Sequence, residues 1–101
     1  MNNYRLLTYT FIVEFRGGTY CSQVQAKNVG ESLFAWTEKL KKEKGEIEHL
    51  GDKTIQELEA TLNDEDHQPI LLSGMINAWC GFVSTRKGSF LINIIQTDIE
   101  N

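Results

Sequence analysis

The sequence predicts an α+β fold of the order ββα(α)βββ, in which one antiparallel sheet of about five strands carries one long and one short helix on one face. Three observations lead to this prediction. Apolar and polar residues alternate around Gly17-Gly18, apolar residues recur at helical spacing after Asn28, and three short apolar runs lie within residues 69–97. The 101 residues have room for one domain, residues 1–101, with flexible ends at 1–5 and 98–101.

The first two strands are predicted to form a hairpin. Every second residue from Leu7 to Phe15 is apolar, which is typical of a half-buried strand. A two-residue loop at Gly17-Gly18 would pair Arg16 with Thr19, since glycine adopts the positive φ that such loops require. The pairs that follow are Phe15 with Tyr20, Val13 with Ser22, Phe11 with Val24 and Tyr9 with Ala26.

The long helix is predicted to begin at Asn28, whose side chain suits an N-cap, with Glu31 completing a capping box. Lysines gather before Gly45, where they favour the carboxyl end of a helix and the glycine favours its termination. One stripe at helical spacing would cover the apolar side of the hairpin. It consists of Val29, Leu33, Trp36, Thr37 and Leu40.

The short helix follows a connector whose conformation stays open. Residues 46–51 alternate polar with apolar, which fits either a short strand or an extended link. Asp52 or Thr54 then caps a helix with Ile55, Leu58 and Leu62 on one side. Residues 63–67 are strongly polar and are predicted as a solvent-exposed loop.

The last third is predicted to form three antiparallel strands, residues 69–76, 78–85 and 90–97, with turns near Asn77 and at Lys87-Gly88. The second turn would pair Thr85 with Phe90, Val83 with Ile92, Gly81 with Ile94 and Trp79 with Gln96. The other side of these strands is nearly as apolar, around Phe82, Leu91 and Ile95. Because the hairpin and its helix cover only one side, this second face is a candidate contact for a partner or another subunit.

Charge and hydropathy exclude several classes of protein. The net charge is −4, and residues 28–67 hold eleven acids against five lysines, so binding to nucleic acid is disfavoured. No uncharged run is long enough for a membrane-spanning helix. The amino-terminal residues do not resemble an export signal, which predicts a cytoplasmic location with Cys21 and Cys80 reduced and packed as small apolar residues.

No motif indicates catalysis, a cofactor or a metal. His49 and His67 are far apart, and the acids beside them do not follow the ligand spacing of zinc or calcium sites. Both cysteines fall within predicted strands rather than on the sharp turn that presents a nucleophile. We therefore expect no catalytic, cofactor-binding or metal-ligating residue.

The sequence is most consistent with a small non-enzymatic domain that binds another protein, such as an acidic antitoxin or immunity-type inhibitor of a basic target; a homodimer is a further expectation. Acidic residues would steer the partner and apolar residues of the second face would contact it. The alternative is a small-molecule-binding protein or enzyme with a pocket between the helix carrying Trp36 and the sheet carrying Trp79. The expected partner-binding residues are Glu57, Glu59, Asp64, Glu65, Asp66, Phe82, Leu91 and Ile95.

Overall fold

The computed structural model describes residues 5–98. Residues 1–4 and 99–101, which make up most of the predicted flexible ends, lie outside the described residues. The strands are β1 (Leu7–Phe15), β2 (Gly18–Ala26), β3 (Ile70–Leu71), β4 (Ala78–Thr85) and β5 (Gly88–Gln96). The helices are α1 (Val29–Glu43) and α2 (Asp52–Leu62), with the 3₁₀ turns η1 (Lys44–Glu46) and η2 (Glu65–His67).

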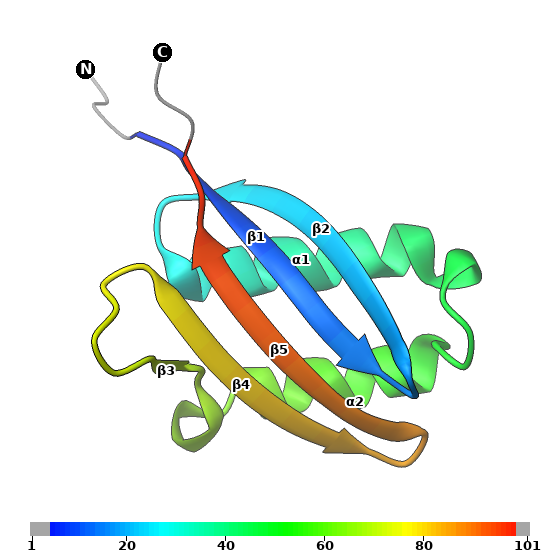
Figure 1. Ribbon diagram of the computed structural model, residues 1–101. Coiled ribbons are helices and arrows are strands. Elements are labelled where there is room, and N and C mark those ends of the chain that lie inside the picture. Colours follow the sequence, from blue (N-terminus) through cyan, green and yellow to red (C-terminus); the bar gives the residue numbers. More distant parts are fainter. Residues whose placement is uncertain (1–4, 99–101) are drawn as a thin grey trace.

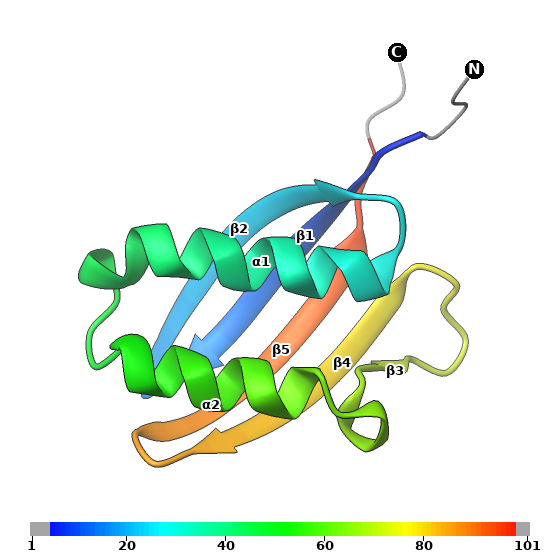
Figure 2. The same ribbon diagram turned by 180° about the vertical axis from the view of Figure 1, so that it is seen from behind.

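The strands form one antiparallel sheet in the order β2-β1-β5-β4-β3, and both helices lie on the same face of it (Figures 1 and 2). Helix α1 lies against β2 and β1, and α2 lies against β4. The predicted α+β class and the single covered face are therefore confirmed. Strands β1 and β5, one from each hairpin, pair with each other in the middle of the sheet. This pairing joins residues far apart in the chain, and the strand order was not predicted from the sequence.

The core lies between the sheet and the two helices. Alternate residues of the central strands point into it, because successive side chains of a strand point to opposite faces. Phe11 stacks on Trp36 of α1 with ring centroids 5.0 Å apart, and Phe15 stacks on Phe90 at 4.1 Å. The strand residues buried here are Tyr9, Phe11, Val13, Phe15, Val83, Phe90, Ile92 and Ile94, which face Leu33, Trp36, Leu40, Ile55, Leu58 and Leu62 of the helices.

Both predicted hairpin registers are wrong by two residues. In the first hairpin Phe15 pairs with Gly18, so the loop is Arg16-Gly17 and not Gly17-Gly18. The φ angles of Arg16 and Gly17 are 50° and 81°, which is the geometry of a type I′ turn. Gly18 instead begins β2, where an added Cβ would lie 2.7 Å from the hydroxyl oxygen of Tyr20.

The second hairpin has the same slip. Thr85 pairs with Gly88, so the loop is Arg86-Lys87. Of these loop-region residues only Gly88 has a positive φ, 147°, and a Cβ there would lie 3.0 Å from Cγ of Arg16 in the neighbouring hairpin. Since the shift is even in both hairpins, every side chain stays on the face that was predicted for it.

Helix α1 begins as predicted. The backbone N–H of Glu31 donates to Oδ1 of Asn28 over 2.9 Å, and Nδ2 of Asn28 donates to Oε2 of Glu31 over 3.3 Å. The return bond of the predicted capping box thus goes to the Asn28 side chain instead of its backbone. Helix α2 differs from the prediction, since Gly51 is its N-cap and no side chain caps it there. The connector is neither of its two alternatives but a turn, with His49 at φ 65°.

The prediction of a full strand over residues 69–76 is wrong. Strand β3 holds only Ile70 and Leu71, which pair with Cys80 and Trp79. The chain then turns, because Met75 N–H donates to the carbonyl of Leu72 over 3.0 Å and Gly74 takes a φ of 81°. A turn of this kind ends the strand, and most of the apolar run becomes an exposed loop.

Candidate interaction surface

The side of the sheet turned away from the helices, here called the open face, is covered by no other element among residues 5–98 (Figure 1). Its residues are the ones that alternate with the core residues of each strand. Among the described strands, only Glu14 places a charged side chain in this phase. The apolar residues in this phase are Ile12, Cys21, Ile70, Ala78, Cys80, Phe82, Leu91 and Ile95.

The predicted contact residues Phe82, Leu91 and Ile95 lie together on the open face. Leu91 pairs with Phe82 on one side and with Glu14 on the other, and Ile95 pairs with Ala78. Phe82 is 61% exposed, whereas Leu91 and Ile95 are half-buried between their neighbours on adjacent strands. An exposed aromatic ring on a nearly uncharged sheet surface is typical of a protein contact.

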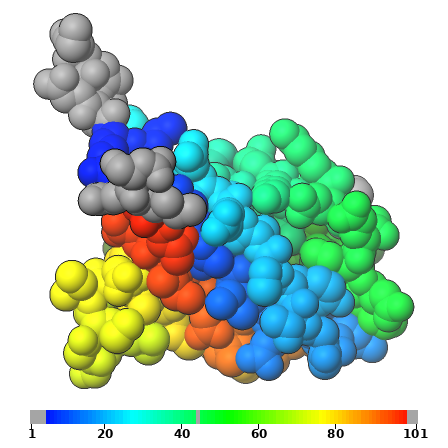
Figure 3. Space-filling model, turned by 45° about the horizontal axis from the view of Figure 1, so that its top comes forward, coloured from blue at the N-terminus to red at the C-terminus, as the bar shows by residue number. Residues whose placement is uncertain are grey.

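The turn region between β3 and β4 adds exposed apolar residues that sequence reasoning assigned to a strand. Ile76 is 90% exposed, and Leu72 and Met75 are also exposed. In the space-filling view this segment (yellow) projects at the margin of the molecule beside β5 (red to orange) (Figure 3). The signal that could have identified this loop is Ser73-Gly74, a turn-forming pair inside the apolar run.

Two of the predicted acidic residues, Glu57 and Glu59, lie on α2 and bind groups of neighbouring elements. Glu57 accepts a hydrogen bond from the backbone N–H of Arg86 over 2.9 Å, which ties α2 to the β4–β5 turn. Glu59 lies 3.1 Å from Nζ of Lys41. Lys41 donates to Glu38 and to Glu59, and these hydrogen bonds raise the pKa of the lysine, with the larger effect from Glu38. These two carboxylates join structural elements and lie away from the open face.

The other three predicted acids form an exposed corner at η2. Asp64 caps η2 by accepting from the N–H of Asp66 over 3.0 Å, and its Oδ2 lies 3.1 Å from Nδ1 of His67. The hydrogen bond from Asp66, followed by the interaction with His67, holds the pKa of Asp64 below its usual value of 3.8. Glu65 and Asp66 are exposed beside it. We call Asp64, Glu65 and Asp66 the acidic corner.

The acidic corner meets the open face at the outer side of β4. A hollow of about 280 Å³ is lined by Asp66 and His67 from η2 and by Phe82 and Cys80 from β4. The structure therefore brings Asp66 and Phe82 to one site, although 16 positions of sequence separate their numbers. Pro69 lies against Gly81 there, 3.3 Å from the place of a Cβ, so the approach is close.

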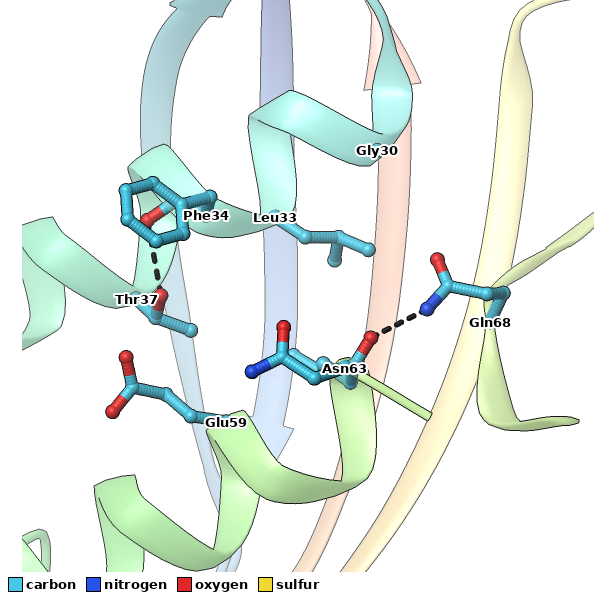
Figure 4. A pocket seen from close by; sticks show the side chains of 8 residues that line it. Gly30, Leu33, Phe34, Thr37, Glu59, Asn63 and Gln68 are labelled. Atoms are coloured by element: carbon cyan, nitrogen blue, oxygen red, sulfur yellow. Dashed lines mark hydrogen bonds between the residues drawn. The ribbon is translucent and has the colours of Figure 1, made fainter. Parts of the chain in front are cut away.

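The hollows near the helices are small. One of about 170 Å³ lies between α1 and α2, bordered by Phe34, Glu59 and Asn63, and Gln68 beside it donates to the carbonyl of Leu62 (Figure 4). Another of about 240 Å³ lies at Trp36 and the edge strand β2. Both are below the roughly 300–1,000 Å³ of ordinary ligand pockets. The predicted space between Trp36 and the sheet is filled, because Trp36 stacks on Phe11.

One wider depression lies over the start of α1. It measures about 510 Å³ and is bordered by the apolar side chains of Leu6, Ala26 and Phe34, with Lys27 and Glu31 at its rim. Phe34 is 65% exposed there. Its two charges are of opposite sign and it lies on the helical side of the sheet, so it is separate from the open face.

The cysteines and histidines form no reactive constellation. Cys21 is exposed and Cys80 half-buried, both as free thiols, so the expectation that both pack as small apolar residues is wrong for Cys21. Within residues 5–98 no three histidine, cysteine or acidic side chains gather closely enough to hold a metal ion. Among residues 5–98, neither α1 nor α2 has the length and hydropathy of a membrane-spanning helix.

Comparisons with known proteins give no indication of function, so a function has to be inferred from the structure itself. No protein-family model matches the chain, and neither the curated proteins nor the solved structures gave a match. The open face and the acidic corner are the two features of the surface from which a function can be inferred.

Proposed function

We propose that this chain is a non-enzymatic domain that binds another protein through its open face, with the acidic corner directing a basic partner to it. The observation that carries the proposal is a five-stranded sheet with helices on one face only and a single charge, Glu14, on the other. Antiparallel sheets that leave one face in water normally alternate apolar with polar residues. Here the uncovered face keeps an apolar region around Phe82 and Leu91, with the uncharged Asn93 between Leu91 and Ile95.

The central part of that region supports a protein contact in which the ring of Phe82 is the main buried group. Phe82 stands 61% exposed beside half-buried Leu91, and Cys80 and Ile70 continue the apolar surface toward β3. Contact sites of proteins are enriched in aromatic anchors with few charges at their centre. The open face has this composition, and its rim on the β4 side is polar and acidic.

The acidic corner supports a basic partner. Exposed Asp66 lines the same hollow as Phe82, Glu65 is exposed beside Asp66, and the chain carries a net charge of −4. Complementary charge at the rim of a contact accelerates association and excludes partners of the wrong sign. An antitoxin or immunity-type inhibitor, which must occupy a basic target quickly, would use such a surface.

The proposal is tested with three matched baits. The wild-type chain, Phe82→Asp and Phe34→Asp are immobilised and exposed to native extract, and the retained proteins are compared by mass spectrometry. Both rings are exposed to a similar degree, 61% and 65%, but Phe34 lies on the helical side. A protein retained by wild type and Phe34→Asp and lost from Phe82→Asp supports the open face. Equal retention by all three baits contradicts it.

A further inference from the structure

The outer edge of β2 is an unprotected strand edge. β2 is a nine-residue strand at the end of the sheet, paired with β1 on one side only. A two-residue loop makes Phe15 and Gly18 a hydrogen-bonded pair, so alternate residues from Gly18 onward bond to β1. The residues between them therefore direct their N–H and C=O groups away from the sheet. These are Thr19, Cys21, Gln23 and Gln25, all exposed.

One hydrogen bond confirms this orientation. Nζ of Lys39 in α1 donates to the backbone carbonyl of Gln23 over 3.1 Å, from the side opposite β1. A carbonyl oxygen has two lone pairs, so Gln23 can accept a second donor while it keeps this one. The contact with Lys39 therefore leaves the carbonyl of Gln23 able to bond to another strand.

Sheet edges are normally protected by charges, prolines, bulges or covering elements. Residues Gly18–Ala26 include no charged residue and no proline, and the pairing with β1 runs without a bulge from Leu7↔Ala26 to Phe15↔Gly18. The opposite edge differs, since β3 and Pro69 lie along β4 and the acidic corner adjoins it. The β2 edge is therefore the longer uncharged edge, since β3 pairs only with Trp79 and Cys80 of β4 and the acidic corner adjoins that side.

We propose that the β2 edges of two copies of this chain pair antiparallel and join their sheets into one. Charge complementarity favours a second copy as the occupant. Lys39 lies at the carbonyl of Gln23, and Glu43 and Glu46 lie beside residues 19–22. Antiparallel pairing about the middle of β2 would bring the lysine of one copy toward the acids of the other. A contact through the β4 edge would instead bring two acidic corners together. This inference does not rest on the proposed function.

The two-fold axis is expected to pass through Ser22, the middle of β2, because this register pairs the most residues. Cys21 then lies opposite Gln23 of the second copy, and Thr19 opposite Gln25 of the second copy. All these residues direct their backbone groups outward, so each pair can exchange two hydrogen bonds. The axis is perpendicular to the sheet, which leaves both open faces on the same side and free.

The molar mass in solution tests the pairing. Light scattering from micromolar to about millimolar chain is expected to rise toward twice the 11.5 kDa of one chain. Gln23→Lys should return the mass to that of one chain, because a lysine on an edge strand opposes pairing. Ser84→Lys is the matched control, since Ser84 is exposed on the same face of the sheet, in the part of β4 beyond the residues that β3 pairs with. Circular dichroism verifies that both variants are folded.

Two results overturn the proposal. One is a mass of 11.5 kDa at every concentration. The other is a doubled mass that Ser84→Lys abolishes and Gln23→Lys does not, because the contact then uses the β4 side.

Disulfide trapping tests the register. In a Cys80→Ser background, Gln23→Cys would place a thiol opposite Cys21 of the second copy, with Cα atoms about 5.5 Å apart, within the range that a disulfide spans. Mild oxidation should then give covalent dimers, which denaturing gels without reductant detect. Ser84→Cys in the same background should give none. If Gln23→Cys fails to cross-link while the mass is doubled, pairing about Ser22 is refuted.

Discussion

Phe11 of β1 and Trp36 of α1 stack almost in parallel, with ring centroids 5.0 Å apart and planes inclined by 13°. Both rings are buried, at 0% and 2% exposure, so this contact fixes the long helix on the centre of the sheet. We expect Trp36→Ala to lower the free energy of unfolding by about 3–5 kcal/mol, the usual cost of removing a large core ring. Denaturant unfolding followed by circular dichroism measures it.

Phe34 is the matched control for Trp36, since it lies two residues away in α1 but is exposed. Phe34→Ala should change the free energy of unfolding by no more than about 0.5 kcal/mol. Equal effects of the two substitutions would contradict the assignment of Trp36 to the core.

The cap of α1 predicts a smaller effect. Asn28→Ala removes the oxygen that accepts from the N–H of Glu31 and should lower the free energy of unfolding by about 1 kcal/mol. In a domain of this size the melting temperature should fall by roughly 4–8 °C. Asn28→Asp retains the acceptor and should melt close to wild type. A loss as large as that of Asn28→Ala would show that the cap is not the cause.

The first hairpin turn predicts a purely conformational cost. Gly17 has a φ of 81°, and an added Cβ would meet nothing within 4 Å. Gly17→Ala should therefore destabilise by about 1–2 kcal/mol through the left-handed backbone alone. Gly45, which also has open space and no positive φ, is the control, and Gly45→Ala should be nearly neutral. Thermal unfolding of both variants decides the question.

The hairpins show how much of the fold could be predicted from local sequence. Alternation over residues 7–26 identified both strands and their faces, because the side-chain period of a strand is two. The loop position was wrong since the sequence shows adjacent glycines without showing which of them lies in the turn. Gly17 has the positive φ, and Gly18 is needed where the ring of Tyr20 crosses its backbone.

The candidate site depended on information that no local pattern contains. Asp66 and Phe82 share a hollow only because β4 lies next to the short β3 and η2 folds back beside it. The open face was predicted from the apolar second side of β4 and β5. The exposed loop around Ile76 was missed, since apolar composition outweighed the turn signal at Ser73-Gly74 in that prediction.

The acidic corner predicts a pH dependence of stability. The pKa of Asp64 is lowered from 3.8 by the N–H of Asp66 and by His67. A carboxyl group with a lower pKa in the folded than in the unfolded state stabilises the fold above the unfolded value, and the effect is lost as pH falls through the folded value. Unfolding free energy should therefore fall more steeply below pH 3.8 in wild type than in Asp64→Asn.

Asp66→Asn is the control for that pH dependence, because it keeps the backbone N–H that donates to Asp64. Its stability should follow the wild-type pH profile in this window. NMR titration of the Asp64 carboxyl group measures the pKa directly, and a value at or above 3.8 would contradict the hydrogen-bonded cap.

The salt dependence of association tests whether the acidic corner steers a partner. For a protein captured through the open face, the association rate should fall as salt rises from about 50 to 500 mM, because ions screen exposed charges. The triple variant Asp64→Asn, Glu65→Gln, Asp66→Asn should associate more slowly at low salt and lose most of this dependence. Glu57→Gln is the control, since Glu57 is held by Arg86 away from the open face. A rate that is the same at all salt concentrations would leave the apolar surface as the only determinant of binding.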